Sequence, residues 1–211
     1  MYFVSENRIK KMRDVLSKRQ DSLRLFMDNV YSNHNLSAIV RTCDAINIGK
    51  LYYQHQKSVK LNKEITLGTH KWLFTEYIDD VNLFYSKIKD SGYQIVVSAL
   101  ESDSIDFREV DYTKPTLVVV GNEVEGVSKE SLEIADKKIL IPMYGMTQSL
   151  NVSVATAVIL YEAQRQRELA GMYDFAQLSE EFIDKIIKKW GYEDLLENMK
   201  QKAKARVKEK K

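Results

Sequence analysis

The order of apolar and polar residues predicts alternating strands and helices through the middle of the chain. Short apolar runs typical of strands occupy residues 28–30, 50–54, 94–99, 116–120 and 138–141. Between them, apolar residues recur at helical spacing over 36–46, 81–90, 129–134 and 152–169. The runs YQIVVSAL and TLVVVG are largely apolar, which is typical of parallel strands covered on both faces. The pattern therefore predicts an α/β fold, with a mostly parallel sheet and helices on both faces.

Helical spacing also extends over both ends of the chain. Residues 5–28 carry apolar residues at helical spacing, so one helix is expected there, with Ser5 as its N-cap. Ser179 can cap a second helical stretch, Gly191 interrupts it, and a third runs over 193–210. We therefore divide the chain into a basic helical extension at 1–28, an α/β domain at 29–170, and a C-terminal helical extension with a basic tail at 171–211.

Charge is distributed unevenly along the sequence. The net charge is only +2, but residues 1–24 and 200–211 together carry a formal +10 and the remainder −8. Arg8, Lys11 and Arg19 fall within one sector of the expected N-terminal helix. Basic ends on an acidic body suggest a polyanionic partner, although solvated ends that only aid solubility give the same pattern.

Several classes of protein are disfavoured by composition. Cys43 is the only cysteine, so no intrachain disulfide can form, and a reducing cytoplasm is the expected compartment. Cys43 lies inside an expected helix, where we interpret it as a small packed residue. No apolar run approaches the roughly 20 residues that cross a bilayer. The three histidines are scattered and lack cysteine partners, so no metal site is expected.

Two loops that precede expected helices carry candidate chemistry. The segment NHNLSAIVR opens the helix near 36, with Asn33 or Asn35 as its expected N-cap. Arg41 lies near the start of that helix, where the dipole disfavours a cation, so it requires an anionic partner or a surface salt bridge. The loop GNEVEGVS follows a strand and precedes a helix capped by Ser128. It matches neither the P-loop nor the dinucleotide-binding pattern, and a tight turn that needs glycine fits it equally well.

A third loop, IPMYGMTQSLNVSVA, leads from a strand into a helix. Ser149 and Asn151 offer a hydroxyl and an amide at the helix start, while Met and Leu side chains can line an apolar pocket. Free N–H groups at a helix start can bind a carboxylate or phosphate. An ordinary capped loop is the alternative. In open α/β sheets, ligands bind where such loops gather at the carboxyl ends of strands.

Together, the segments HNLSAIVRTCDA, GNEVEG and IPMYGMTQSLNVSVA resemble the three motifs of the SpoU branch of the SPOUT RNA methyltransferases, over residues 29–168. We call them the motif-one segment (34–45), the motif-two loop (121–126) and the motif-three segment (141–155). The resemblance implies methylation of a ribose 2′-hydroxyl, S-adenosylmethionine as cofactor, a deep C-terminal trefoil knot and a homodimer. The basic ends resemble those of the tRNA enzymes of this branch that methylate guanosine 18 in the D-loop, whereas the minimal relatives that modify the tRNA wobble base lack such ends.

The resemblance also assigns roles to individual positions. It places at the reacting ribose the residues Asn35, Arg41, Glu123, Ser149 and Asn151. It places around the cofactor Leu100, Gly121, Asn122, Ile141, Met143, Ser149 and Leu150. It implies contacts to RNA from Arg8, Lys11, Arg19, His34, Arg165 and Arg167. Many relatives have glycine where Asn47 stands, but asparagine also tolerates a left-handed helix end.

The resemblance leaves the role of Arg41 open. Methyl transfer needs in-line attack of the 2′-oxygen on the methyl group of the cofactor. Arg41 is either a general base activated by a substrate phosphate or a protonated clamp that stabilises the alkoxide. Because arginine stays protonated in proteins, the clamp is easier to defend. Two other classes compete: a knotted RNA-binding protein without catalysis, and a Rossmann-like dehydrogenase, for which the glycine fingerprint is missing.

Overall fold

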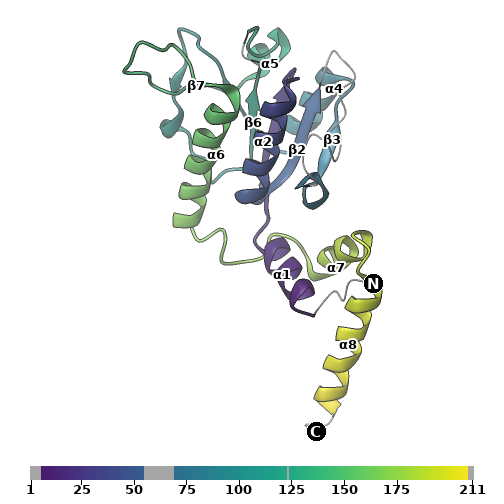
Figure 1. Cartoon of the computed structure of the whole chain (residues 1–211). Coiled ribbons are helices and arrows are strands. Elements are labelled where there is room, and N and C mark those ends of the chain that lie inside the picture. The colour runs from purple at the N-terminus through teal and green to yellow at the C-terminus, as the bar shows by residue number, and fades with distance from the viewer. Residues whose placement is uncertain (1–5, 55–68, 123, 209–211) are drawn as a thin grey trace. The chain divides into compact units, whose positions relative to one another are not determined.

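The computed structural model describes residues 6–54, 69–122 and 124–208. The chain divides into two compact units, one formed by Gln20–Met172 and the other by Met1–Arg19 with Tyr173–Lys211 (Figure 1). In the described part of the chain, no helix is long and apolar enough to cross a membrane.

The larger unit is built on a seven-stranded parallel sheet. Its strands are β1 (Gln20–Asp28), β2 (Ile48–Gln54), β3 (Thr75–Tyr77), β4 (Gln94–Ser98), β5 (Ile105–Asp106), β6 (Thr116–Val120) and β7 (Lys137–Leu140). They lie in the order β3-β2-β1-β6-β4-β7-β5, and each of these neighbours pairs in parallel. The parallel α/β fold predicted from the apolar runs is confirmed.

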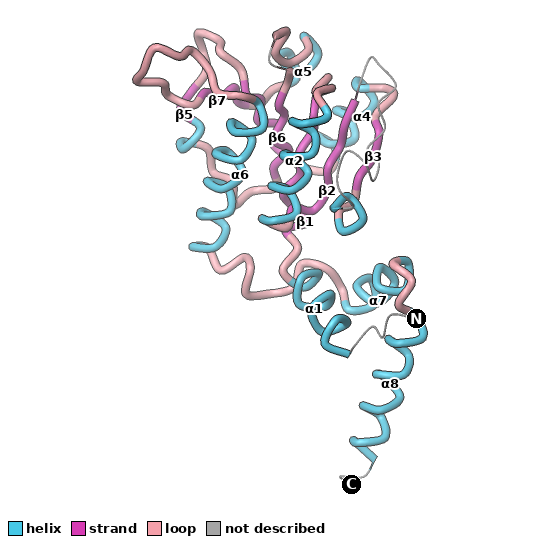
Figure 2. The backbone as a smooth tube through the Cα atoms, viewed as in Figure 1, coloured by secondary structure: helices cyan, strands magenta, loops and turns pink. Residues whose placement is uncertain are grey.

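Helices cover both faces of this sheet, as Figure 2 shows. One face packs against α2 (Asn33–Ala45) and α6 (Val152–Leu169), and the other against α4 (Val81–Asp90) and α5 (Lys129–Ile134). Alternate residues of β1 pack on the two faces: Leu25 and Met27 lie in the core beneath α2 and α6, and Phe26 lies in the core beneath α4 and α5. Two short 3₁₀ turns also occur: η1 (Thr69–Trp72) precedes β3, and η2 (Phe107–Glu109) follows β5.

The expected helix over 5–28 is wrong in its second half. The helix α1 covers only Glu6–Ser17, and Gln20–Asp28 form β1, a central strand of the sheet. Because both faces of β1 are buried, its apolar residues need not alternate with polar ones, and the spacing of Leu23 and Phe26 imitates a helix. The expected strand at 28–30 therefore lies earlier, and the α/β unit begins at Gln20 rather than at residue 29.

Other local predictions are confirmed. The bounds of α4, α5 and α6 agree with the expected helices, and the Ser128 hydroxyl caps α5 by accepting from the Ser131 backbone N–H. Asn47 has φ of +61°, the left-handed conformation expected after α2. The N-cap of α2 is Ser32, so neither Asn33 nor Asn35 caps this helix.

The smaller unit combines the two ends of the chain, which the sequence analysis treated as separate extensions. It contains α1, α7 (Glu180–Lys189) and α8 (Glu193–Lys208). Arg13 of α1 forms ion pairs with Glu180 and Asp184 of α7. Apolar residues of these two helices are buried, among them Ile9, Met12, Leu16, Ile183, Ile186 and Ile187.

Candidate active site

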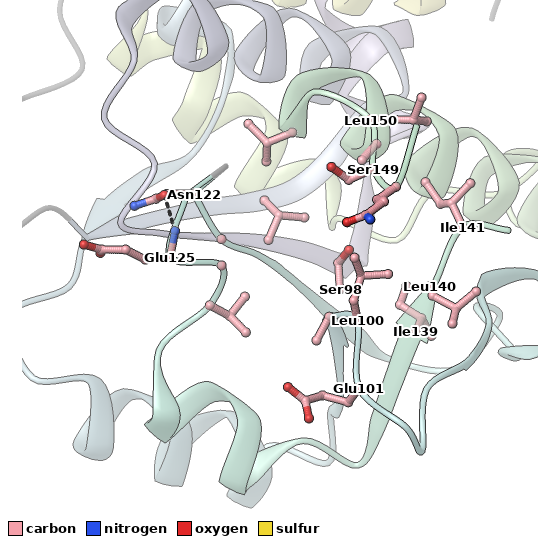
Figure 3. A pocket seen from close by; sticks show the side chains of 18 of the residues that line it. Ser98, Leu100, Glu101, Asn122, Glu125, Ile139, Leu140, Ile141, Ser149 and Leu150 are labelled. Atoms are coloured by element: carbon pink, nitrogen blue, oxygen red, sulfur yellow. Dashed lines mark hydrogen bonds between the residues drawn. The ribbon is translucent and has the colours of Figure 1, made fainter. Parts of the chain in front are cut away.

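A pocket of about 380 Å³ lies where β4, β6 and β7 end and α6 begins (Figure 3). Every residue expected around the cofactor lines it: Leu100, Gly121, Asn122, Ile141, Met143, Ser149 and Leu150. The fold therefore brings together side chains that lie up to 50 positions apart in the sequence. This is the carboxyl edge of a parallel sheet, where ligands of α/β proteins commonly bind.

The walls of the pocket suit a nucleoside. Apolar side chains contribute much of the lining, including Ala99, Ile139 and Leu150, and can cover the faces of a heteroaromatic ring. Polar groups are fewer, and Glu101 and Glu125 offer carboxylates that can accept from hydroxyl groups. The pocket volume is in the range of small-ligand sites, roughly 300–1,000 Å³. The residues present thus fit an adenosyl group.

The motif-two loop forms one wall of this pocket as a tight turn. Asn122 and Gly126 exchange two backbone hydrogen bonds of 3.0 Å, and Asn122 Oδ1 accepts from the backbone N–H groups of Val124 (2.7 Å) and Glu125 (3.0 Å). A Cβ at Gly121 would lie 2.1 Å from the carbonyl oxygen of Gly126, so only glycine fits there. Among the described residues, the buried Asn122 Nδ2 has no hydrogen-bond partner. Glu123, expected at the reacting ribose, lies outside the described residues.

The motif-one and motif-three segments meet beside the pocket. Asn151 Nδ2 donates to Asn35 Oδ1 at 3.1 Å, across 116 positions of sequence. Asn35 is only 4% exposed. Asn151 also caps α6, because its Oδ1 accepts from the backbone N–H of Ser153 at 2.9 Å. Its chain neighbours Leu150 and Val152 both line the pocket, so the amide pair stands at the rim.

Arg41 and His34 project from the same helix, α2, as exposed side chains. No described residue forms an ion pair or hydrogen bond with Arg41, so the structure gives no support to the surface salt bridge that was the alternative. A cation without a described protein partner, on the helix that carries Asn35, is available to an anionic ligand.

The cations expected to bind RNA separate into two groups. Arg8 and Lys11 of α1 are exposed, and Arg165 is exposed while paired with Glu162 at 2.7 Å. Arg19 and Arg167 are fully buried, so their assignment to RNA contact is wrong. Arg19 follows the end of α1, which removes it from the basic sector of that helix.

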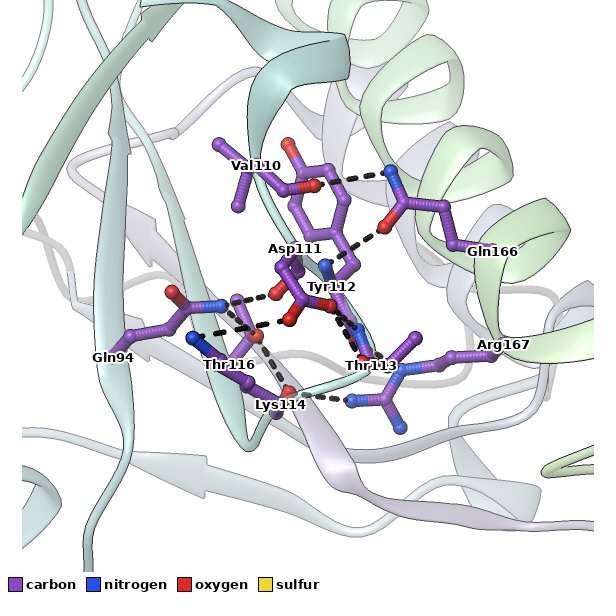
Figure 4. Close-up of polar contacts among 9 residues, drawn as sticks. All are labelled: Gln94, Val110, Asp111, Tyr112, Thr113, Lys114, Thr116, Gln166 and Arg167. Atoms are coloured by element: carbon purple, nitrogen blue, oxygen red, sulfur yellow. Dashed lines mark hydrogen bonds and ion pairs between the residues drawn. The ribbon is translucent and has the colours of Figure 1, made fainter. Parts of the chain in front are cut away.

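Arg167 is instead a structural residue. Its guanidinium donates to the carbonyl oxygens of Tyr112 (2.9 Å), Lys114 (3.0 Å) and Ser22 (3.1 Å). The neighbouring Gln166 side chain accepts from Tyr112 N and donates to Val110 O (Figure 4). These contacts fasten the last turn of α6 to the segment before β6. The helical pattern carried a signal for this role: Arg167 lies four positions after Ala163 and seven after Leu160, which are both buried, so it continues the buried side of α6.

Two further titratable residues lie outside the pocket lining. Cys43 is buried, and burial raises the pKa of its thiol, an effect that the neighbouring Asp44 reinforces. Cys43 is thus a packed residue, as expected, and not a nucleophile.

Asp28, a fully buried carboxylate at the end of β1, was not predicted from the sequence. A charged residue that closes an apolar run was the available signal, since buried charges need partners.

Comparison with known proteins agrees with this arrangement. Residues 22–161 match the model of the SpoU rRNA Methylase family, and residues 165–206 match the model of the SpoU rRNA methylase C-terminal region. The chain belongs to the SpoU methylase family. The C-terminal match includes α7, which makes this helix a family feature rather than an unrelated addition.

Individual SpoU proteins are similar over nearly the whole chain. The tRNA (guanosine(18)-2′-O)-methyltransferase of Aquifex aeolicus is 59% identical over 201 residues, which cover 94% of this chain and 95% of that protein. The crystal structure of the A. aeolicus TrmH/SpoU tRNA modifying enzyme has a TM-score of 0.84 at 60% identity, covering 90% of this chain and 97% of that one. AviRb of Streptomyces viridochromogenes, solved with the cofactor AdoMet, has a TM-score of 0.65 at 27% identity, covering 74% and 64%.

Proposed function

We propose that this chain transfers a methyl group from S-adenosylmethionine to the ribose 2′-oxygen of guanosine 18 in tRNA. The observation that carries the proposal is the convergence of the three motif segments: the Asn35–Asn151 contact lies at the rim of the pocket formed by the motif-two loop and the motif-three segment. The printed activity of the A. aeolicus relative supplies the nucleotide. We expect the reaction to take place in the cytoplasm, where thiols stay reduced. The only cysteine in the sequence, Cys43, is buried and free, which agrees with such a compartment.

The pocket residues bind and orient the cofactor, which when bound supplies a methyl group activated by a sulfonium. Leu100, Ile141 and Leu150, with backbone groups at Gly121 and Met143, would hold the adenosyl group of the cofactor. Apolar side chains in this lining would reduce the screening of electrostatic contacts to it. Correct alignment of the two reactants contributes several kcal/mol, about the size seen in well-oriented intramolecular reactions.

Arg41 stabilises the oxygen that attacks. Its protonated guanidinium binds the substrate phosphate beside the 2′-oxygen and stabilises the negative charge that develops on that oxygen. The 2′-oxygen would form its bond to the methyl carbon while the carbon–sulfur bond of the sulfonium breaks, and the hydroxyl proton would pass to water. Asn35, Asn151 and Ser149 hold the ribose by hydrogen bonds from their amides and hydroxyl. Glu123 of the motif-two loop completes this set. A general-base role for Arg41 would require a neutral guanidinium, whereas arginine stays protonated in proteins.

The exposed cations of α1 bind the body of the tRNA. Arg8 and Lys11 contact phosphates, and Arg165 and His34 extend the same kind of contact on the larger unit. Phosphate contacts position an RNA without reading its sequence, so the selection of guanosine 18 rests on groups beside the cofactor pocket and on the shape of the folded tRNA.

A homodimer completes the site in this proposal. The exposed face of α6 presents Val154 (48% exposed) and Tyr161 (52% exposed), seven positions apart and thus on one side of the helix. Val158 lies between them and is partly buried. A second copy covers this stripe next to Asn151. Sedimentation equilibrium tests this: the wild-type chain has the mass of a dimer and Tyr161→Glu that of a monomer, whereas a monomeric wild type contradicts it.

We also propose that the chain is knotted, as its family resemblance implies. The side chains of Gln166 and Arg167 fasten α6 to residues 110–114, which precede the motif-two loop by seven or more positions. Pulling both termini of single molecules tests the knot. A knotted chain stops short of the contour length of 211 residues, and an unknotted chain reaches it.

The function is tested by incubating the purified chain with bulk RNA and methyl-labelled S-adenosylmethionine, then mapping the label. Label confined to the 2′-oxygen of guanosine 18 in tRNA is expected. Cofactor binding without transfer to any RNA would indicate an RNA-binding protein that has lost catalysis. Binding of a nicotinamide nucleotide in place of the methyl donor would indicate a dehydrogenase. Either result contradicts the proposal.

A further inference from the structure

We propose that Asp28 is a positioning residue that fixes the motif-two loop for cofactor binding. This role rests on the proposed function, because it concerns the same pocket. Asp28 is the last residue of β1 and is fully buried. Asp28 does not itself line the pocket, and its side chain hydrogen-bonds Asn29, Ser128 and Ser131, so its effect must pass through the residues that it holds.

One carboxylate oxygen of Asp28 accepts three hydrogen bonds from residues at the start of α5. Asp28 Oδ2 accepts from the Ser128 backbone N–H (2.7 Å), the Ser128 hydroxyl (2.7 Å) and the Ser131 hydroxyl (2.6 Å). A buried carboxylate is costly unless it is hydrogen-bonded, and this one stands at a helix start, where the dipole favours an anion. Three donors on one oxygen hold the first turn of α5 in a single position.

A tyrosine of the neighbouring helix extends this network. Tyr85 of α4 lies 2.6 Å from the Ser131 hydroxyl, and burial raises the pKa of the Tyr85 phenol. Tyr85 therefore keeps its proton and donates it to Ser131, whose own hydrogen points to Asp28. The chain Tyr85–Ser131–Asp28 links α4, α5 and β1, three elements that carry no candidate catalytic residue of their own.

The position of Ser128 affects the pocket through the short segment of chain that precedes it. Ser128 directly follows Val127, a pocket-lining residue, and the motif-two loop begins at Gly121, only seven positions before Ser128. The paired backbone bonds between Asn122 and Gly126 make this loop one body. When Ser128 is held by Asp28, the wall formed by Gly121, Asn122 and Val127 is held as well.

Asp28 also acts on the segment that follows it. Its other carboxylate oxygen accepts from Asn29 Nδ2 at 3.0 Å, and Asn29 has φ of +58°, the left-handed turn from which the chain proceeds towards α2. Asn35 lies in the first turn of α2. Asp28 thus fixes the motif-two loop, which lines the pocket, through Ser128. It also fixes the turn at Asn29, which leads to the motif-one segment.

The test compares Asp28→Asn and Ser131→Ala with Gln166→Ala in the full-length chain. Gln166 bonds Val110 and Tyr112, outside the pocket, so its variant loses buried hydrogen bonds without touching this network. Calorimetric titration with S-adenosylmethionine gives the Kd, and thermal unfolding gives the Tm of each variant. We expect the Kd to rise at least tenfold in Asp28→Asn and severalfold in Ser131→Ala, but less than twofold in Gln166→Ala. In steady-state assays, the KM for the cofactor should rise more than kcat falls.

A Kd within twofold of wild type in both Asp28→Asn and Ser131→Ala overturns the positioning role. It is also overturned if Gln166→Ala weakens binding equally at the same loss of Tm, since that indicates general destabilisation. If Asp28→Asn does not fold, Ser131→Ala and Tyr85→Phe carry the same comparison. A wild-type chain that binds the cofactor but methylates no tRNA refutes the proposed function, while the Kd comparison still decides the role of Asp28.

Discussion

Three arginines illustrate how residues of one type differ in role at the scale of the single side chain. Arg41 is exposed and has no described partner, Arg165 is exposed and paired with Glu162, and Arg167 is buried among backbone carbonyls. Arg165 and Arg167 are two positions apart on α6 and therefore face different sides of this helix. Burial and partner distinguish the catalytic role proposed for Arg41 from the surface position of Arg165 and the structural role of Arg167.

Replacing Arg41 should affect catalysis and leave stability unchanged. Arg41→Ala should lower kcat by about 100-fold, because one donor to a developing oxyanion is removed. Arg41→Lys should lose most of the activity as well, since a bidentate fork becomes a point charge. Steady-state methylation assays and thermal unfolding measure both effects, with Lys114→Ala as an exposed control. Near-normal kcat in both Arg41 variants would remove Arg41 from the mechanism.

Replacing Arg167 should affect stability instead. Arg167→Met leaves the carbonyls of Ser22, Tyr112 and Lys114 without this donor, and the expected loss is about 3 kcal/mol or more in free energy of unfolding. Arg165→Met, two positions away and exposed, should cost less than about 0.5 kcal/mol. Denaturant unfolding compares the two. Equal losses would show that the buried cluster contributes nothing beyond an ordinary surface pair.

At the scale of the element, the start of α6 combines a helix cap with a contact across the site. Asn151→Ala loses both, and the missing cap should cost about 1 kcal/mol of stability. Asn151→Ser keeps a good cap but is too short to reach Asn35, so it should retain the wild-type Tm while losing activity as severely as the alanine variant. Full activity in Asn151→Ser would mean that the amide contact has no part in holding the ribose.

The elements differ in how well local sequence predicts them. The helices α4, α5 and α6 have clear caps, such as Ser128 and Asn151, and their bounds follow from these caps and from the helical spacing of their apolar residues. β1 does not follow, because a strand buried on both faces has no period of two in its polarity. Its identity depends on pairing with β2 and β6, which lie far along the chain.

At the scale of the whole molecule, the candidate site was predictable only through its three motif segments. Residues of the pocket, from Leu100 to Leu150, were anticipated because the family resemblance links segments that local physics cannot join. Asp28 was not, because its three donors come from residues 128 and 131, about 100 positions away. Arg19 was not separated from the exposed Arg8 because the end of α1 at Ser17 was not predicted, whereas Arg167 continues the buried side of α6 and could have been recognised.

The basic ends should contribute to tRNA binding by neutralising phosphates. The double variant Arg8→Ala, Lys11→Ala should weaken tRNA binding and make the plot of log K against log salt shallower, by about 0.7–0.9 for each phosphate that the variant no longer neutralises. Lys87→Ala, an exposed cation of α4, is the control and should leave the slope unchanged. Filter binding over a range of salt concentrations measures the slopes. An unaltered slope in the double variant would mean that Arg8 and Lys11 are solvated surface residues that do not contact the tRNA.

The proposed reaction depends on one oxygen atom of one nucleotide. A tRNA assembled with 2′-deoxyguanosine at position 18 differs from the natural substrate only in that atom. With labelled S-adenosylmethionine, the wild-type chain should methylate the ribose-containing tRNA and leave the deoxy tRNA unlabelled, while binding both with similar affinity. Equal labelling of the two tRNAs would contradict the proposed reaction.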